Sequence, residues 1–246
     1  MRLLLLTIYL FSSFSLLAVR PFITDDARVV GKYLAQWESW LRFEKHSGQQ
    51  WHMAAYGPSD KWELTLGAVM GYANVNAEKN EFSYALPLLQ AKYLVKEYGY
   101  KKGPGIAFVG GTFLPMGRGS FVPQTYGAFS FVNFTQCFGK NEDVLIHANA
   151  GISYLFTSNK NWVNTLGLGT QIRTYKGLHV LGEVFSGDPY IPGAGLAYQA
   201  GVRHFVSDYL QFDATFGKGI SGIEKLPFWS SVGVRVVSSY FLRKKQ

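Results

Sequence analysis

From about residue 33 onward, the sequence alternates apolar and polar residues with a period of two, in short stretches separated by turns. Successive side chains of a β-strand point to opposite faces, so this alternation predicts strands with one apolar and one polar face. The first stretch has Tyr33, Trp37 and Leu41 on one face and Glu38 and Arg42 on the other. Because the pattern recurs to the C-terminus, we expect an all-β fold built almost entirely from such strands.

Applied to the whole chain, the alternation predicts about twelve strands, most of them near the ~9–11 residues that cross a bilayer when tilted. The expected ranges are 33–44, 50–57, 62–74, 86–97, 105–115, 126–138, 144–156, 162–175, 178–186, 194–206, 209–217 and 228–240. In 105–115 and 126–138 both faces are largely apolar or glycine, so the alternation does not decide which face of these two strands points inward. An even strand number in this range is typical of single-chain outer-membrane proteins. We therefore expect a transmembrane, antiparallel, up-and-down β-barrel.

The connections between the expected strands alternate in length. Tight connections lie at 58–61, 139–143, 176–177 and 207–208, and longer ones join the opposite strand ends at 75–85, 117–125, 188–193 and 218–227. Short turns on one side and long loops on the other are typical of outer-membrane barrels, although a soluble barrel or sandwich remains the alternative. Two interfacial girdles would account for the aromatic residues near strand ends, namely Tyr33, Phe43, Trp62, Tyr72, Phe113, Tyr126, Phe138, Phe156, Trp162, Phe228 and Tyr240.

The N-terminus has the organisation of a secretory signal peptide. A basic start at Arg2 precedes an apolar run over residues 3–11 and a more polar stretch that ends at Ala18. Cleavage near Ala18 would leave residues 19–246 as the barrel domain. A retained helical anchor is the alternative, but the unbroken apolar run is shorter than the ~18 residues that a span needs.

Composition fits export to a membrane. Charged residues make up only 16% of the chain, whereas a soluble protein usually has about 25%. The net charge is +8, but the basic residues are scattered along the sequence. We see no nucleic-acid signature in this distribution and expect no nucleic-acid partner.

One motif lies between the signal peptide and the first strand. Residues 20–27 read Arg-Pro-Phe-Ile-Thr-Asp-Asp-Ala, with Arg20, Pro21, Thr24, Asp25 and Asp26 as its defining positions. This run resembles the opening of the bacterial family named for the MetA pathway of phenol degradation. The resemblance implies an outer-membrane β-barrel described as a transporter, whose substrate is unproven. Asp25 and Asp26 would either cap a turn through side-chain to backbone hydrogen bonds or belong to a plug or gate.

If the apolar faces meet lipid, the polar faces line a lumen. The inward candidates are Glu38, Arg42, Glu63, Lys92, His147, Arg173, His179, Glu183, Arg203, Asp213 and Arg235. The first and last strands are neighbours in a closed barrel, so we expect Glu38, Arg42 and Arg235 to approach one another, with Arg203 and Asp213 on the adjoining pair. Such a network either holds a narrow barrel shut or forms a polar pathway for a small aromatic or anionic solute.

Enzymatic motifs are not found in the sequence. The histidines occur neither in a Gly-x-Ser-x-Gly context nor at His-x-x-x-His spacing, so we predict no catalytic residue, no metal site and no cofactor. We expect a monomer in the outer membrane that contacts lipid and the barrel-assembly machinery and passes a small solute passively. The alternative is a non-conducting structural or surface-interaction barrel that works through the long loops 75–85 and 218–227.

Overall fold

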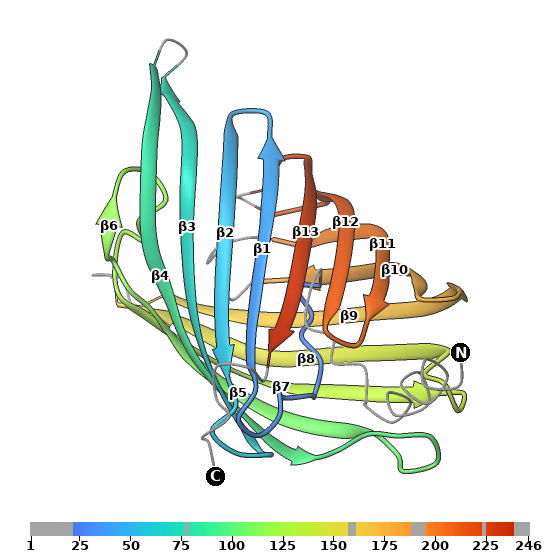
Figure 1. Ribbon diagram of the computed structural model, residues 1–246. Coiled ribbons are helices and arrows are strands. Elements are labelled where there is room, and N and C mark those ends of the chain that lie inside the picture. The colour runs from blue at the N-terminus through green and yellow to red at the C-terminus, as the bar shows by residue number, and fades with distance from the viewer. Residues whose placement is uncertain (1–21, 77–78, 157–160, 188–194, 223–224, 239–246) are drawn as a thin grey trace.

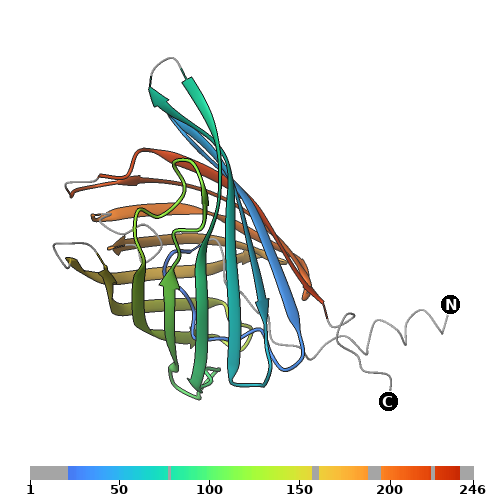
Figure 2. The same ribbon diagram turned by 90° about the vertical axis from the view of Figure 1, so that its left-hand side faces the viewer.

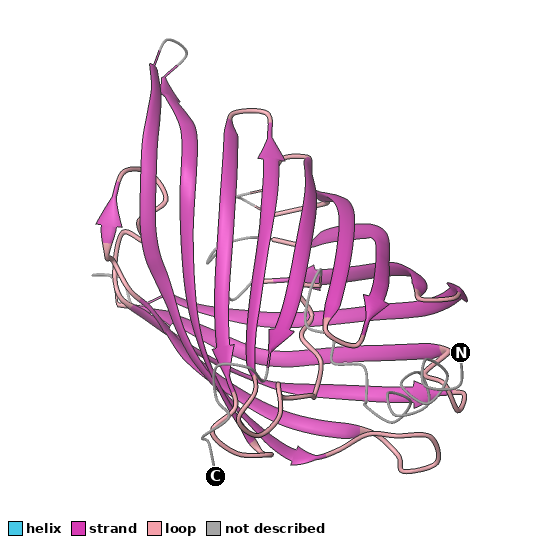
Figure 3. Ribbon diagram, viewed as in Figure 1, coloured by secondary structure: helices cyan, strands magenta, loops and turns pink. Residues whose placement is uncertain are grey.

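The computed structural model describes residues 22–76, 79–156, 161–187, 195–222 and 225–238, and these residues form a β-structure (Figure 3). The predicted signal peptide (residues 1–18), Arg20, Pro21 and Tyr240 lie outside the described residues. The strands are β1 (Ala35–Glu44), β2 (Ser47–Tyr56), β3 (Trp62–Asn76), β4 (Lys79–Lys96), β5 (Gly105–Phe113), β6 (Gly117–Arg118), β7 (Gly127–Phe138), β8 (Val144–Leu155), β9 (Asn161–Tyr175), β10 (Leu178–Ser186), β11 (Ala197–Ser207), β12 (Leu210–Gly219) and β13 (Trp229–Ser238).

The long strands close into a barrel. Within the described part of the chain, twelve of them pair antiparallel in the order β3-β2-β1-β13-β12-β11-β10-β9-β8-β7-β5-β4, and β4 pairs with β3 to complete the ring (Figures 1 and 2). Closure satisfies the backbone groups that an open sheet edge would leave unpaired. The predicted twelve-strand antiparallel barrel is confirmed, with the two-residue β6 as an additional strand that pairs with β4.

The prediction of a long loop at residues 75–85 is wrong. β3 continues to Asn76 and β4 begins at Lys79, so this region is mostly an extended hairpin that rises above the neighbouring strands in Figure 1. The pairings Asn74↔Asn80 and Asn76↔Lys79 continue the β3–β4 ladder beyond Ala73, the last residue of β3 in register with β2. Most residues in the run 74–81 are polar in the sequence, so the period-2 alternation that predicts a strand is lost there.

Other boundaries also shift. β1 begins at Ala35 and not at residue 33, because Tyr33 adopts a left-handed backbone with φ of 59°. β2 begins at Ser47, three residues before the predicted start, since it continues to pair with β1 up to Phe43↔Gly48. β12 continues to Gly219, so the predicted loop 218–227 is shorter than expected.

The two faces of the wall have opposite polarity. Apolar side chains point outward, as shown by Leu168 on β9, which is 60% exposed, whereas Lys92 on β4 is 0% exposed. The aromatic residues predicted near strand ends are exposed with one correction among those described: Phe113 is buried inside the barrel. No helix among the described residues is long and apolar enough to span a membrane.

Candidate functional site

The charged residues predicted to line the lumen lie on the inward face of the wall. Those that are buried are Glu38, Arg42, Glu63, Lys92, Glu183, Arg203 and Arg235. Arg173 and Asp213 are partly exposed, and strand register places them in the inward row that contains Arg203. The interior of the barrel is therefore surrounded by charged side chains of both signs.

The expected approach of the first and last strands is found only in part. Arg235 Nε lies 4.0 Å from Glu38 Oε1 and donates to Gln36 Oε1 at 2.7 Å. Arg42 does not join this pair, because it forms an ion pair with Glu44 at 2.7 Å and lies over the ring of Trp229. The prediction that brought Arg42 to Glu38 and Arg235 is therefore wrong: Arg42 lies further along β1 and has its own acidic partner.

The chain that precedes β1 occupies the barrel interior. We call residues 22–34 the inner segment, which appears in Figure 1 as the blue chain inside the ring of strands. Its residues 24–30 are all buried. The motif residues Thr24, Asp25 and Asp26 thus lie within the lumen.

Glu183 on β10 binds one end of the inner segment. The amides of Ile23 and Thr24 donate to its two carboxylate oxygens, each at 2.7 Å. Gln199 on β11 donates to the same carboxylate at 2.7 Å. Three donors therefore surround a buried carboxyl group, whose two oxygens are both hydrogen-bonded.

Lys92 on β4 binds the middle of the inner segment. Its Nζ atom lies 2.6 Å from Asp25 Oδ2, and it also donates to the carbonyl oxygens of Asp26 and Arg28 at 3.2 and 3.1 Å. Asn133 on β7 donates to Asp25 Oδ2 at 3.0 Å. Asp25 is thus a contact between the inner segment and two separate strands.

Two further contacts carry the inner segment across the barrel. The amide of Ala27 donates to Thr135 on β7 at 2.9 Å, and the amide of Val30 donates to Glu63 on β3 at 2.8 Å. In the order of the described strands, β3 lies diametrically opposite β10, where Glu183 binds the other end. The inner segment therefore spans the full width of the lumen.

Asp26 also has the local role that the sequence allowed. Its Oδ1 atom accepts a hydrogen bond from the Arg28 amide at 2.8 Å, which closes a turn, and its Oδ2 atom lies 2.9 Å from Arg28 Nη2. Burial lowers the pKa of Arg28, but the charges of Asp26 and Glu142 outweigh burial and raise it above its ordinary value, so Arg28 stays charged. Turn formation and lumen occupation, which the sequence posed as alternatives, occur together here.

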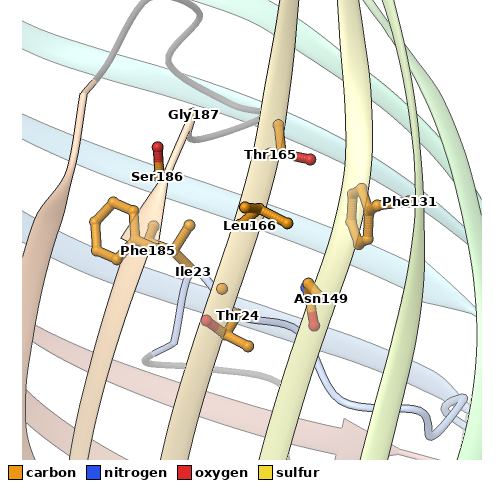
Figure 4. A pocket seen from close by; sticks show the side chains of 10 residues that line it. Ile23, Thr24, Phe131, Asn149, Thr165, Leu166, Phe185, Ser186 and Gly187 are labelled. Atoms are coloured by element: carbon orange, nitrogen blue, oxygen red, sulfur yellow. The ribbon is translucent and has the colours of Figure 1, made fainter. Parts of the chain in front are cut away.

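Little space remains beside Ile23, Thr24 and Asp25 of the inner segment. A cavity of about 10 Å³ is lined by Ile23 and Thr24 of the inner segment and by Phe185, Leu166 and Asn149 of the wall (Figure 4). A second cavity, of about 20 Å³, lies between Asp25 and the wall near Glu38 and Glu63. Either volume holds about one water molecule. The inner segment thus constricts the barrel at these two places.

Part of the interior is aromatic, which sequence reasoning missed. Trp40, Met53, Leu88, Val109, Phe113, Phe129 and Phe131 form a buried cluster on the inward face. Trp40 stacks on Trp51 with ring centroids 5.6 Å apart. The available signal was Trp40 on the polar face of its strand, together with the missing alternation in 105–115 and 126–138. Lipid contact was not the only reason for apolar residues in this chain.

Metal binding finds no support in the described residues, where no group of three or more His, Cys, Asp or Glu side chains could hold an ion.

A larger cavity of about 270 Å³ lies at the end of the barrel where β1 begins, beside Arg28, Tyr98 and Glu142. Burial raises the pKa of the Tyr98 phenol well above its ordinary value, so Tyr98 is neutral.

No protein-family model matches this chain, and no curated protein matches it. Solved structures do match in fold. An outer membrane channel from Pseudomonas putida F1 aligns with a TM-score of 0.65 and 10% identity, over 90% of this chain and 100% of that chain. The KdgM porin aligns with a TM-score of 0.57 and 10% identity, over 82% and 98% of the two chains. The NanC porin aligns with a TM-score of 0.55 and 8% identity, over 83% and 98%. The chain has the fold of outer-membrane channel barrels.

Proposed function

We propose that this protein is an outer-membrane channel that passes a small solute passively, and that the inner segment is its constriction. One observation carries the proposal. The barrel closes through backbone pairing among its own strands, whereas the inner segment is attached by wall side chains such as Glu183, Lys92 and Glu63. Moving the inner segment would therefore break side-chain contacts and leave the ring of strands intact.

The matched structures support the class of function. The solved structures named above are described as an outer membrane channel and as porins, and each aligns over nearly its whole length. The proposal includes export with removal of residues 1–18, a monomer in contact with outer-membrane lipid, and insertion by the barrel-assembly machinery. It includes no catalytic step. Membership in the MetA-pathway family remains a prediction from residues 20–27.

Single-channel recording tests the proposal. The mature chain and a variant lacking residues 22–30 are refolded, checked for the heat-dependent gel mobility of a folded barrel, and recorded in planar bilayers. We expect the deletion to raise conductance several-fold, because it removes the part of the inner segment that contacts Glu183, Lys92 and Glu63 and constricts the lumen. A folded deletion variant that carries no current would contradict the proposed channel function.

The hairpin offers a matched control for this experiment. Replacing residues 74–80 with Asn-Gly, a pair suited to a two-residue hairpin turn, removes the projecting tip of β3 and β4 and leaves the lumen unchanged. We expect this variant to conduct like the parent chain. The result separates an effect of the inner segment from a general effect of shortening the chain.

A second candidate function rests on that hairpin. It projects beyond the neighbouring strands in Figures 1 and 2, and Tyr72 and Phe82 pack edge-to-face near its tip with ring centroids 5.2 Å apart. A non-conducting barrel that binds a partner at the cell surface would use such a projection. If neither the variant lacking residues 22–30 nor the variant with the shortened hairpin conducts in bilayers, and the shortened hairpin no longer binds a cell-surface partner, this function would be favoured over the channel.

A further inference from the structure

A row of basic side chains crosses one side of the barrel interior. Strand register pairs Arg173 with His179, His179 with Arg203, and Arg203 with Asp213, across four consecutive strands from β9 to β12. Arg235 on β13 is close to this row, since its register partner Gln211 lies two residues from Asp213. We call Arg173, His179, Arg203 and Arg235 the basic row.

Three of the four members of the basic row are buried, and the donors of its arginines are incompletely used. Arg203, Arg235 and His179 are each 1% exposed. Arg203 donates through Nη1 to Gln171, but within the described part of the chain its Nε and Nη2 atoms have no hydrogen-bond partner. The same holds for Nη2 of Arg235 and Nε of Arg173. A guanidinium offers five donors, and a buried donor without an acceptor is costly.

Carboxylates lie beside two members of the basic row. Asp213 faces Arg203 in register, and Glu38 Oε1 lies 4.0 Å from Arg235 Nε, whereas the register partner of Arg173 is His179 and not a carboxylate. The carboxylate of Glu183, four positions from His179 along β10, accepts hydrogen bonds from Ile23, Thr24 and Gln199. An anion beside the basic row would accept the hydrogen bonds that these guanidinium groups leave unused.

Apolar rings flank the central guanidinium. The rings of Phe22 and Phe205 lie 5.7 Å from the guanidinium carbon of Arg203. Phe205 also packs edge-to-face against His179, with ring centroids 5.1 Å apart. Phe22 belongs to the inner segment, so a ligand here would contact both the wall and the constriction.

From these observations we infer that the basic row binds the carboxylate of a small apolar acid, with its apolar group against Phe22 and Phe205. Guanidinium groups suit this ligand because they bind both oxygens of a carboxylate. The role of the site as a selectivity element rests on the proposed channel function. Binding itself does not depend on conduction.

Calorimetric titration with sodium benzoate, at constant ionic strength, tests the site on the folded chain in detergent. We expect saturable binding that Arg203→Gln weakens by about tenfold, equal to about 1.4 kcal/mol, through loss of a charged donor. Lys218→Gln removes an equal charge from an exposed position on the same strand as Asp213 and should bind like the parent chain. Benzyl alcohol has the ring without the carboxylate and should not compete.

Each outcome decides the inference. Absence of benzoate binding, equal binding by Arg203→Gln, or competition by benzyl alcohol would overturn it. If Arg203→Gln lacks the gel mobility of a folded barrel, Arg235→Gln gives the same decision by removing a neighbouring donor. Benzoate binding by a barrel that carries no current would retain the site and reject the channel, whereas current without benzoate binding would reject the site alone.

Discussion

At the scale of single residues, the pair Lys92 and Asp25 joins the barrel wall to the inner segment. Both side chains are buried, and their charged atoms lie 2.6 Å apart. Removing one partner of a buried pair leaves the other charge without compensation, which costs more than removing both. The pair therefore makes the position of the inner segment depend on one lysine of β4.

Lys92→Met should destabilise the protein by about 3 kcal/mol, because Asp25 loses its counter-charge and the carbonyl oxygens of Asp26 and Arg28 lose a donor. Urea unfolding in lipid vesicles measures this loss. Lys96→Met, at an exposed position of the same strand, is the control. The double variant with Asp25→Asn should recover part of the loss. Equal stability of the Lys92 and Lys96 variants would contradict the role of the pair.

At the scale of elements, β9 serves both faces of the wall through the run Leu166-Gly167-Leu168-Gly169. Its leucines are exposed on the outer face, and its glycines face the inner segment. A Cβ atom on Gly167 would lie 2.4 Å from Thr24 Oγ1, and one on Gly169 would lie 3.3 Å from the ring of Phe22. The glycines are therefore needed for the close approach of the inner segment.

Gly167→Val should displace the inner segment, because no side chain fits between β9 and Thr24. The substitution Ile23→Cys, in a Cys137→Ser background, reports the displacement, because a displaced inner segment would expose the new thiol and a thiol reagent would label it faster. Gly182→Val on β10 is the matched control, since a Cβ atom there meets nothing within 4 Å. Equal labelling rates in the two valine variants would show that the glycine is not required.

At the scale of the whole molecule, the polarity of the fold is reversed relative to a soluble protein. Charged residues such as Arg203 and Glu183 are buried within the barrel, while leucines and aromatic residues cover its outside. A lipid exterior stabilises this arrangement because it solvates the apolar face, and the closed ring leaves no backbone groups exposed to hydrocarbon.

Leu168→Arg tests this environment. Leu168 is the central residue of β9, and an arginine on the lipid face costs about 2–4 kcal/mol near the bilayer midplane. Thr174→Arg lies near the strand end, where the cost falls to about 0–1 kcal/mol. Unfolding in lipid vesicles should separate the two variants in this order. A water-exposed barrel would tolerate both equally, which would contradict membrane insertion.

The sequence by itself determined the wall of this protein. Period-2 alternation gave the strand number and the face of residues such as Glu38 and Arg203, because each side chain's direction in a strand follows from its position along the chain. The same signal weakened where both faces carry similar residues, as in the β3–β4 hairpin and the aromatic cluster around Phe129 and Phe131.

Only the tertiary structure decided what occupies the lumen. The contacts of Thr24 with Glu183 and of Asp25 with Lys92 join residues 159 and 67 positions apart in the chain. No local pattern encodes such contacts, because they depend on barrel closure, on the register of each strand and on the path of the inner segment. The basic row likewise depends on strand register. The sequence placed Arg203 and Asp213 on adjoining strands, but only the structure aligned Arg173 and His179 with Arg203.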